Sequence, residues 1–321
     1  MVKKLVKIIS GVTVLAIALA IIFFNRYSIY DWERLHNYHA PQNIALLADQ
    51  TTMTSKAREI FYATYPQIQG KTEFNSNCQV KEQTIVLGCY TSGSIFLFNV
   101  DTPELNGVEQ VTAAHEMLHA AYARLSSSEK KRIDVLLEEA FKKINNPELN
   151  QTMASYQKTE PGEQDNELHS ILATEYENLG TDLETYYRQY FANRAQVVAY
   201  ANQYKEVFQN IKNQVANDDA ELAIEKTKIT NLEATLSAEY SDLQSQKINL
   251  QNAIKTLPAY EYNAQVADYN SRVDQYNAQV ATLKSYIAAY NTLVEQRNAL
   301  AVQQQGLANS LNSNTPTVTT N

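Results

Sequence analysis

A heptad repeat covers more than a quarter of the 321-residue chain and constrains its fold more than any other feature. Apolar residues recur every seven positions over residues 208–257, and a second series of tyrosines and aliphatic residues covers 262–294. Pro258 separates the two series, and a proline ends a helix because it lacks a backbone N–H. Two heptad arms of similar length around one proline predict an antiparallel coiled-coil hairpin over residues 201–309.

Polar residues weaken the seam between the two predicted arms. Half of each heptad seam comes from the d positions, and in the first arm several of these are charged or amide residues: Asp218, Glu225, Glu239 and Gln246. The second arm places large tyrosines at d. Such a seam packs loosely or needs a partner, so we expect either self-association or binding to another envelope protein.

The amino terminus reads as a membrane anchor. Residues 8–24 are free of charge and almost wholly apolar, which is near the lower limit of what spans a bilayer. The basic residues before this run outnumber the one directly after it: Lys3, Lys4 and Lys7 against Arg26. The positive-inside rule then puts the amino terminus in the cytoplasm and the bulk of the chain outside a single-pass segment, residues 1–30. A cleaved signal peptide ending near Ala18-Leu19-Ala20 is the alternative.

Charge and cysteine content narrow the classes of partner. The net charge of −8 argues against a nucleic-acid binder, which would carry a basic surface. Cys78 and Cys89 flank a strand-like segment, and an oxidising exterior permits a disulfide between them. Two unpaired thiols are the alternative.

Residues 31–200 are predicted to form one domain that is mainly helical with a small β-sheet. Strand-like runs cover 84–90 and 94–100. Helices are predicted over 107–125, from the capping box Ser126-x-x-Glu129 to about residue 145, and over 166–179. The polar stretch 148–165 is predicted to be a loop, and the tail 310–321 to be disordered.

The chemistry lies in the first of these helices. His115-Glu116-x-x-His119 stands in a segment whose other residues from Val111 to Ala121 carry no charge. Residues i and i+4 share a helix face, so both imidazoles can bind one ion while the glutamate points toward its open side. Zinc held in this way lowers the pKa of a bound water, and the glutamate takes the proton.

This segment resembles the active-site helix of the zincin metallopeptidases. The third-histidine extension of the metzincins does not follow His119, so the resemblance is to gluzincins, whose third ligand is a glutamate from a later helix. Asn166-Glu167-Leu168-His169-Ser170 resembles the start of that helix in thermolysin-like enzymes, and by this match Glu167 is the third zinc ligand. Glu175 and His169 are the competing ligands. The resemblance covers residues 94–180.

Two features of the resemblance concern the surroundings of the metal. Thermolysin-like helices carry an aspartate four residues after the glutamate, but this chain has Ile171 there, so a histidine must be oriented by another group. The zincin edge strand that binds substrate corresponds to residues 94–100, which could equally be a core strand. The oxyanion donor could be any of Tyr122, Tyr156 and Tyr176.

The sequence therefore predicts a membrane-anchored, extracytoplasmic zinc metallopeptidase. Zn²⁺ would be bound by His115, His119 and Glu167, Glu116 would be the general base, and a peptide or protein would be the substrate. The alternative is an envelope scaffold or adhesin in which the coiled coil is the function and the metal site is structural or vestigial.

Overall fold

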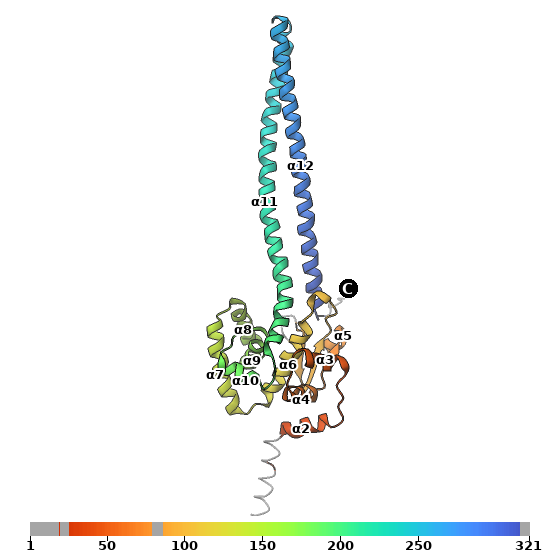
Figure 1. Ribbon diagram of the computed structural model, residues 1–321, viewed down its shortest axis with the longest axis vertical. Coiled ribbons are helices and arrows are strands. Elements are labelled where there is room, and N and C mark those ends of the chain that lie inside the picture. The colour runs from red at the N-terminus through yellow and green to blue at the C-terminus, as the bar shows by residue number, and fades with distance from the viewer. Residues whose placement is uncertain (1–18, 20–25, 79–85, 315–321) are drawn as a thin grey trace, which may run out of the picture. The chain divides into compact units, whose positions relative to one another are not determined.

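The computed structural model describes residue 19 and residues 26–78 and 86–314. These residues are mostly helical and include one three-stranded sheet, which confirms the predicted class of a mainly α protein with a small sheet (Figure 1). The chain divides into two compact units: unit 1 comprises Met1–Val207 and Leu307–Asn321, and unit 2 comprises Phe208–Gly306.

Unit 1 begins with short helices and the sheet. In chain order the elements are α2 (Arg26–Leu35), α3 (Gln42–Gln50), α4 (Ser55–Ala63), β1 (Gln67–Gln69), α5 (Lys71–Asn77), β2 (Gly88–Thr91), β3 (Ser94–Phe98) and a 3₁₀ turn (Pro103–Leu105). The remaining helices are α6 (Val108–Arg124), α7 (Ser127–Ile144), α8 (Pro147–Thr159), α9 (Gln164–Glu175), α10 (Thr181–Tyr187) and the start of α11 (Arg194–Ala253). The end of α12 (Ala259–Leu311) also belongs to this unit.

The sheet has the strand order β1-β3-β2, with β1 parallel and β2 antiparallel to β3. The zincin-based assignment of residues 94–100 as an edge strand is therefore wrong, because β3 has a partner on each side. The alternative of a core strand is correct: Ile95 and Leu97 are buried on one face and Phe98 on the other, which explains the poor polar alternation. Ser92 and Gly93 both have positive φ and form the two-residue turn that joins β2 to β3.

Helix α6 crosses the core of unit 1 between the sheet and α9. It begins after Gly107, whose φ of 108° is unfavourable for any residue with a side chain. A Cβ at Gly107 would also lie 2.6 Å from the carbonyl oxygen of Tyr200, so the helix starts directly against α11. Ala113, Ala114, Met117 and Leu118 are fully buried, which accounts for the lack of charge around the motif.

The predicted loop 148–165 is wrong, because α8 occupies Pro147–Thr159. Asn146 caps this helix by accepting hydrogen bonds from the backbone N–H groups of Glu148 and Leu149, at 2.9 and 3.0 Å. Proline at the first helical position fits such a start. Leu149 is the one buried residue of α8, so the segment lacks the apolar periodicity that reveals a helix in a sequence. The capping box of Ser126 and Glu129, by contrast, starts α7 as predicted.

Cys78, at the end of α5, is joined to Cys89 of β2 by a disulfide. The predicted disorder of the tail is wrong for residues 310–314, because α12 continues to Leu311 and Ser313 is 2% exposed. The Ser313 hydroxyl donates a 2.6 Å hydrogen bond to the carbonyl oxygen of Val86. The rest of the predicted tail lies outside the described residues.

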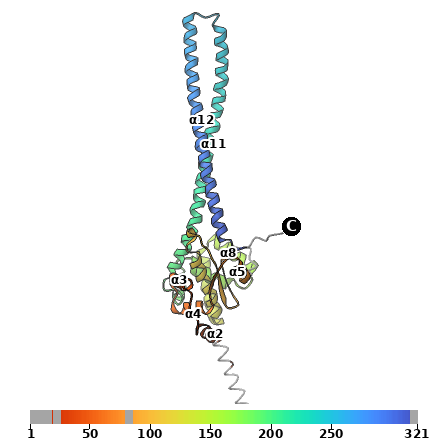
Figure 2. The same cartoon turned by 90° about the vertical axis from the view of Figure 1, so that its right-hand side faces the viewer.

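Unit 2 consists of the two long helices α11 and α12, which run in opposite directions (Figure 2). Arg297 pairs with Asp219 near one end of this unit, and Arg272 pairs with Asp242 further along. The helices are interrupted between Ala253 and Ala259, around the predicted breaker Pro258. Leu236 and Leu243, both predicted a positions, are buried, whereas the coiled-coil packing itself stays a prediction.

The predicted membrane anchor, residues 8–24, lies outside the described residues apart from Leu19. Among the helices that the structure describes, none is both long and apolar enough to cross a bilayer.

Candidate metal centre

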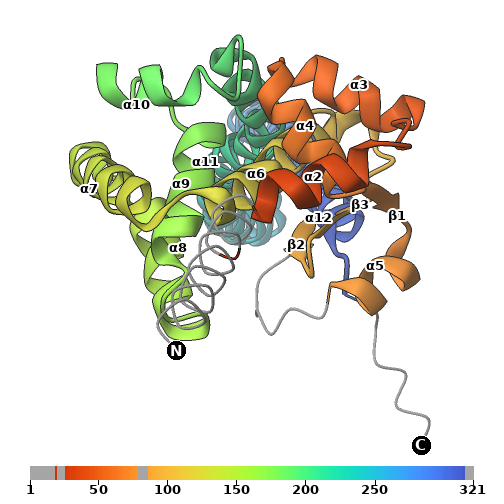
Figure 3. The same cartoon turned by 90° about the horizontal axis from the view of Figure 1, so that it is seen from below.

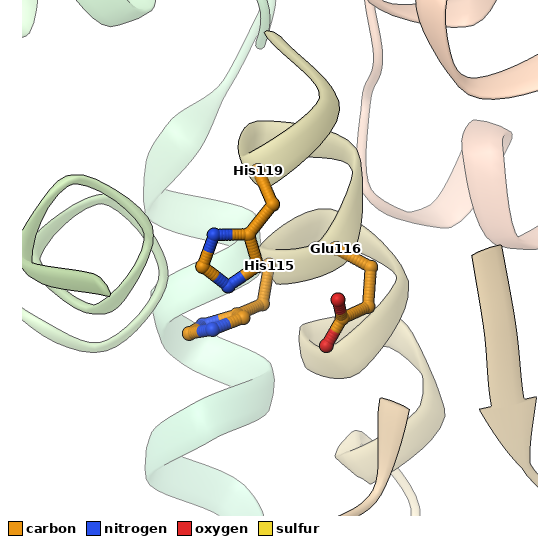
Figure 4. Close-up of side chains that lie close together, drawn as sticks. All are labelled: His115, Glu116 and His119. Carbon is orange, nitrogen blue, oxygen red and sulfur yellow. The ribbon is translucent and has the colours of Figure 1, made fainter. Parts of the chain in front are cut away.

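The imidazoles of His115 and His119 lie on one side of α6, and the Glu116 carboxylate lies beside them (Figure 4). One ligand atom from each of the three residues lies within 4.8 Å of the others, so this group could hold a metal ion. The histidine side chains are 17% and 10% exposed, and Glu116 is 5% exposed. Partial burial of this kind leaves a metal reachable while excluding most bulk water from its ligands.

Helix α9 packs against α6 and brings Glu167 to the same place. One carboxylate oxygen lies 3.5 Å from Nε2 of His115, and the other lies 3.4 Å from Nε2 of His119. These distances exceed those of good N–H···O hydrogen bonds. They match the roughly 3.4 Å between two ligands that each lie about 2.1 Å from a tetrahedral ion. Oε2 of Glu167 is buried and has no hydrogen-bond partner among the described residues.

A donor set of two imidazole nitrogens and one carboxylate is one of the zinc sets found in catalytic sites, where a fourth position stays open for water. Burial raises the pKa of Glu167, but the His119 and His115 imidazoles beside it and the nearby Tyr156 hydroxyl hold it below the usual value. Glu167 therefore carries its negative charge at neutral pH, as a metal ligand must. The residues present fit a divalent zinc ion.

The group that orients a histidine is Asn166, next to the proposed ligand. Its Oδ1 lies 3.0 Å from Nδ1 of His119, and its amide donates a 3.0 Å hydrogen bond to Glu163. With the amide so held, Oδ1 accepts the proton of Nδ1 and leaves the Nε2 lone pair toward Glu167. Ser170 adds a hydroxyl 3.4 Å from the same Nδ1. Ile171, where thermolysin-like enzymes have aspartate, is buried in the apolar core instead.

The two competing ligands have other partners. Glu175 forms a 2.6 Å ion pair with Lys205. His169 is fully buried, with Nε2 2.9 Å from the Tyr186 hydroxyl. Burial lowers the pKa of His169 to about 3, so its ring is neutral. Of the three acceptors that the sequence offered, Glu167 is the one that the structure brings to His115 and His119.

A cavity of about 790 Å³ opens over the site. Strand β2 lines one side, and α6 carries the histidines and Glu116. Helix α8 supplies Tyr156, and the link between α8 and α9 supplies Glu160 and Glu163. Burial, and then the negative charges of Glu167 and Glu163, raise the pKa of Glu160. The cavity has the volume of a small-ligand or peptide-binding site and carries an acidic wall.

The three tyrosines that the sequence offered as oxyanion donors lie in different surroundings. The Tyr122 hydroxyl lines the cavity but donates a 2.8 Å hydrogen bond to Asp134. Tyr176 is not among the residues that line the cavity. Tyr156 lines it and lies close enough to Glu167 to lower the pKa of that carboxyl. Tyr156 is therefore the one of the three tyrosines that both lines the cavity and lies beside Glu167.

Gly88 of β2 makes room for Glu116. A Cβ at this position would lie 2.5 Å from Cγ2 of Thr112 and 2.8 Å from Oε1 of Glu116. No sequence signal marks this glycine, because hydropathy does not tell which strand lies against α6. The backbone of β2 at Gly88 thus packs directly against the Glu116 side chain.

No family model matches this sequence, and neither a curated protein nor a solved structure is significantly similar to it. The chemistry of the site therefore rests on its own geometry.

Proposed function

We propose that this chain is a membrane-anchored, extracytoplasmic zinc metallopeptidase of the zincin type. One observation carries the proposal: Glu167 of α9 lies opposite the Nε2 atoms of His115 and His119, 3.5 and 3.4 Å away. In this proposal residues 31–200 form the zincin-like domain and residues 201–309 an antiparallel coiled-coil hairpin.

Zinc bound by His115, His119 and Glu167 would polarise a peptide carbonyl and lower the pKa of a bound water. Glu116 would act as the general base that takes a proton from the attacking water, and then as the acid that gives this proton to the leaving nitrogen. Tyr156, which lines the cavity beside Glu167, would turn its hydroxyl from that carboxylate to the developing oxyanion. The Asn166 amide oxygen, 3.0 Å from Nδ1 of His119, would hold the ring proton on Nδ1 and leave Nε2 for the metal.

The extended backbone of the substrate would bind along β2. This strand pairs with β3 on one edge only, according to the described residues, and it lines the cavity beside Glu116. A peptide added at the other edge would be held by main-chain hydrogen bonds. In the zincins an edge strand binds the substrate backbone. The sequence assigned that role to residues 94–100, which include β3, and we propose that β2 has it instead.

The proposal is tested on the full chain in detergent. Metal analysis should give one zinc per chain, and a mixed peptide library should be cleaved at internal bonds. Dialysis against a chelator should abolish cleavage, and added Zn²⁺ should restore it. A chain that binds no zinc at neutral pH, or that cleaves equally well after chelation, would contradict the proposal.

Gly88→Ala should lower kcat for peptide cleavage by about 10- to 100-fold, because displacing a catalytic group by about 1 Å costs this much. Zinc content should not change, since the new methyl group meets Glu116 and Thr112 and not the histidines. Gly70→Ala is the matched control, because a Cβ there meets no atom within 4 Å. Equal kcat for Gly88→Ala and wild type would show that Glu116 is not held as described.

Asn166→Ala should weaken zinc binding by about 10- to 100-fold, the usual cost of losing a group that orients a metal-binding histidine. The readout is the zinc Kd from competition with a chromogenic chelator. Asn150→Ala, at an exposed position of the neighbouring helix α8, serves as the control. An unchanged Kd for Asn166→Ala would mean that the contact with His119 does not support the metal.

A further inference from the structure

Helix α2 keeps two charged side chains on its inner face and exposes two large apolar side chains on its outer face. A surface helix normally packs its apolar side chains on the protein and turns its charged ones to water. In α2 the charged residues Asp31 and Arg34 face unit 1, while Ile29 and Trp32 are 47% and 68% exposed. The helix lies on the surface of unit 1, in contact with α4 (Figure 3).

The inner face of α2 is held by specific polar contacts. Asp31 accepts two hydrogen bonds from the Arg124 guanidinium, at 2.7 and 2.9 Å, and both side chains are less than one-fifth exposed. The Tyr65 hydroxyl donates a 2.7 Å hydrogen bond to the carbonyl oxygen of Arg34. The Arg34 guanidinium lies 3.8 Å from the centre of the Tyr65 ring. These contacts fix the rotation of α2 about its own axis, and this rotation turns Ile29 and Trp32 outward.

The outer face consists of Ile29, Trp32 and the exposed ring of His36, whose centroid lies 5.5 Å from that of Trp32. Arg26 and Glu33 flank it. Residues 29, 32 and 36 are three and four positions apart and so form one continuous strip. Trp32 is the most exposed large apolar side chain of the described part of unit 1 and the chain's one tryptophan.

The chain itself indicates what covers this strip. The predicted anchor ends at Phe24, and α2 begins at Arg26. Two residues span at most about 7 Å, so an anchor in the bilayer holds the start of α2 at the level of the lipid headgroups. Tryptophan is enriched at this level because its ring is apolar and its N–H is polar.

We propose that Ile29 and Trp32 insert into the headgroup layer of the membrane that the anchor spans, so that α2 lies along the membrane surface. Arg26, which follows the apolar run, is placed to meet lipid phosphates. The proposal rests on the predicted anchor and not on the metal chemistry. Insertion of Ile29 and Trp32 would fix the orientation of unit 1 at the outer face of the membrane, whereas an anchor alone would leave unit 1 free to reorient.

The test uses the fluorescence of the full chain, since Trp32 is its only tryptophan. The protein is reconstituted into phosphatidylcholine vesicles and into vesicles whose acyl chains are brominated. Brominated lipid should quench the emission by at least about two-fold, because an inserted side chain lies 5–10 Å into the boundary layer. Aqueous acrylamide should quench it less than it quenches the same protein unfolded in urea.

A Trp32→Phe/Tyr260→Trp variant is the control, because residue 260 is 73% exposed and lies in unit 2. Its emission should respond to acrylamide and not to bromine. Three results would overturn the proposal: no bromine quenching of Trp32, equal quenching of the control, or emission that changes with protein-to-lipid ratio, which would indicate a second copy of the chain on the strip. A chain that does not float with the vesicles would be a fourth contrary result, because it would show that no anchor holds the chain in the bilayer. Zinc-free protein should give the same spectra, so this test is independent of the peptidase proposal.

Discussion

Glu116→Gln should lower kcat for peptide cleavage by about 10²- to 10⁴-fold, the contribution of a positioned general base. Glutamine keeps the size of the side chain and removes its ability to take a proton. The zinc Kd should stay at the wild-type value, because the proposed ligands are His115, His119 and Glu167, whose side chains the substitution leaves unchanged. We would measure the rate of peptide cleavage and the zinc binding of each variant on the same preparation.

Glu139→Gln, at an exposed position of α7, is the control for removing one negative charge from unit 1. It should match the wild type in both measurements. Undiminished cleavage by Glu116→Gln would contradict the peptidase mechanism. Zinc binding without any cleavage by the wild type would instead favour the scaffold or adhesin, in which the two long helices of unit 2 are the functional part.

The fold was predictable where local signals were strong and not where contacts were distant. α6 and α7 follow from i, i+4 periodicity and from the Ser126 capping box. The position of β3 inside the sheet could not be predicted, because its second partner is β1, a strand of three residues whose paired residues lie 29 positions away in the sequence. The helix α8 has one buried residue, so its only signal was Asn146 followed by Pro147, which also marks the end of the preceding helix.

The sequence predicted which residues come together at the candidate site, but not what surrounds them. The spacing of His115 and His119 is a property of one helix, and Glu167 came from the resemblance to gluzincins. The role of Asn166 was not predicted, although it precedes Glu167 directly, because its contact with His119 depends on how α9 packs against α6. The role of Gly88 could not be predicted either, because it depends on how closely β2 packs against Glu116 in the folded chain.

Glu167→Gln should weaken zinc binding by more than about 100-fold, because losing a ligand costs more than losing a group that orients one. The change is nearly isosteric, so the packing of α9 on α6 should survive. Glutamine replaces a charged ligand with a neutral one between two imidazoles, and a neutral amide is a poor zinc ligand. The zinc Kd by chelator competition is the direct measurement, and circular dichroism of the zinc-free protein checks the fold.

Glu175→Gln is the matched control, eight residues along the same helix. Its carboxylate pairs with Lys205, so removing the charge should leave the zinc Kd unchanged. If Glu175→Gln lowered zinc affinity and Glu167→Gln did not, the third ligand would be Glu175 and α9 would have to rotate on α6 when the metal binds. If neither variant changed the Kd, the two histidines would bind zinc with another residue. This result would contradict both Glu167 as the third ligand and the catalytic geometry proposed from it.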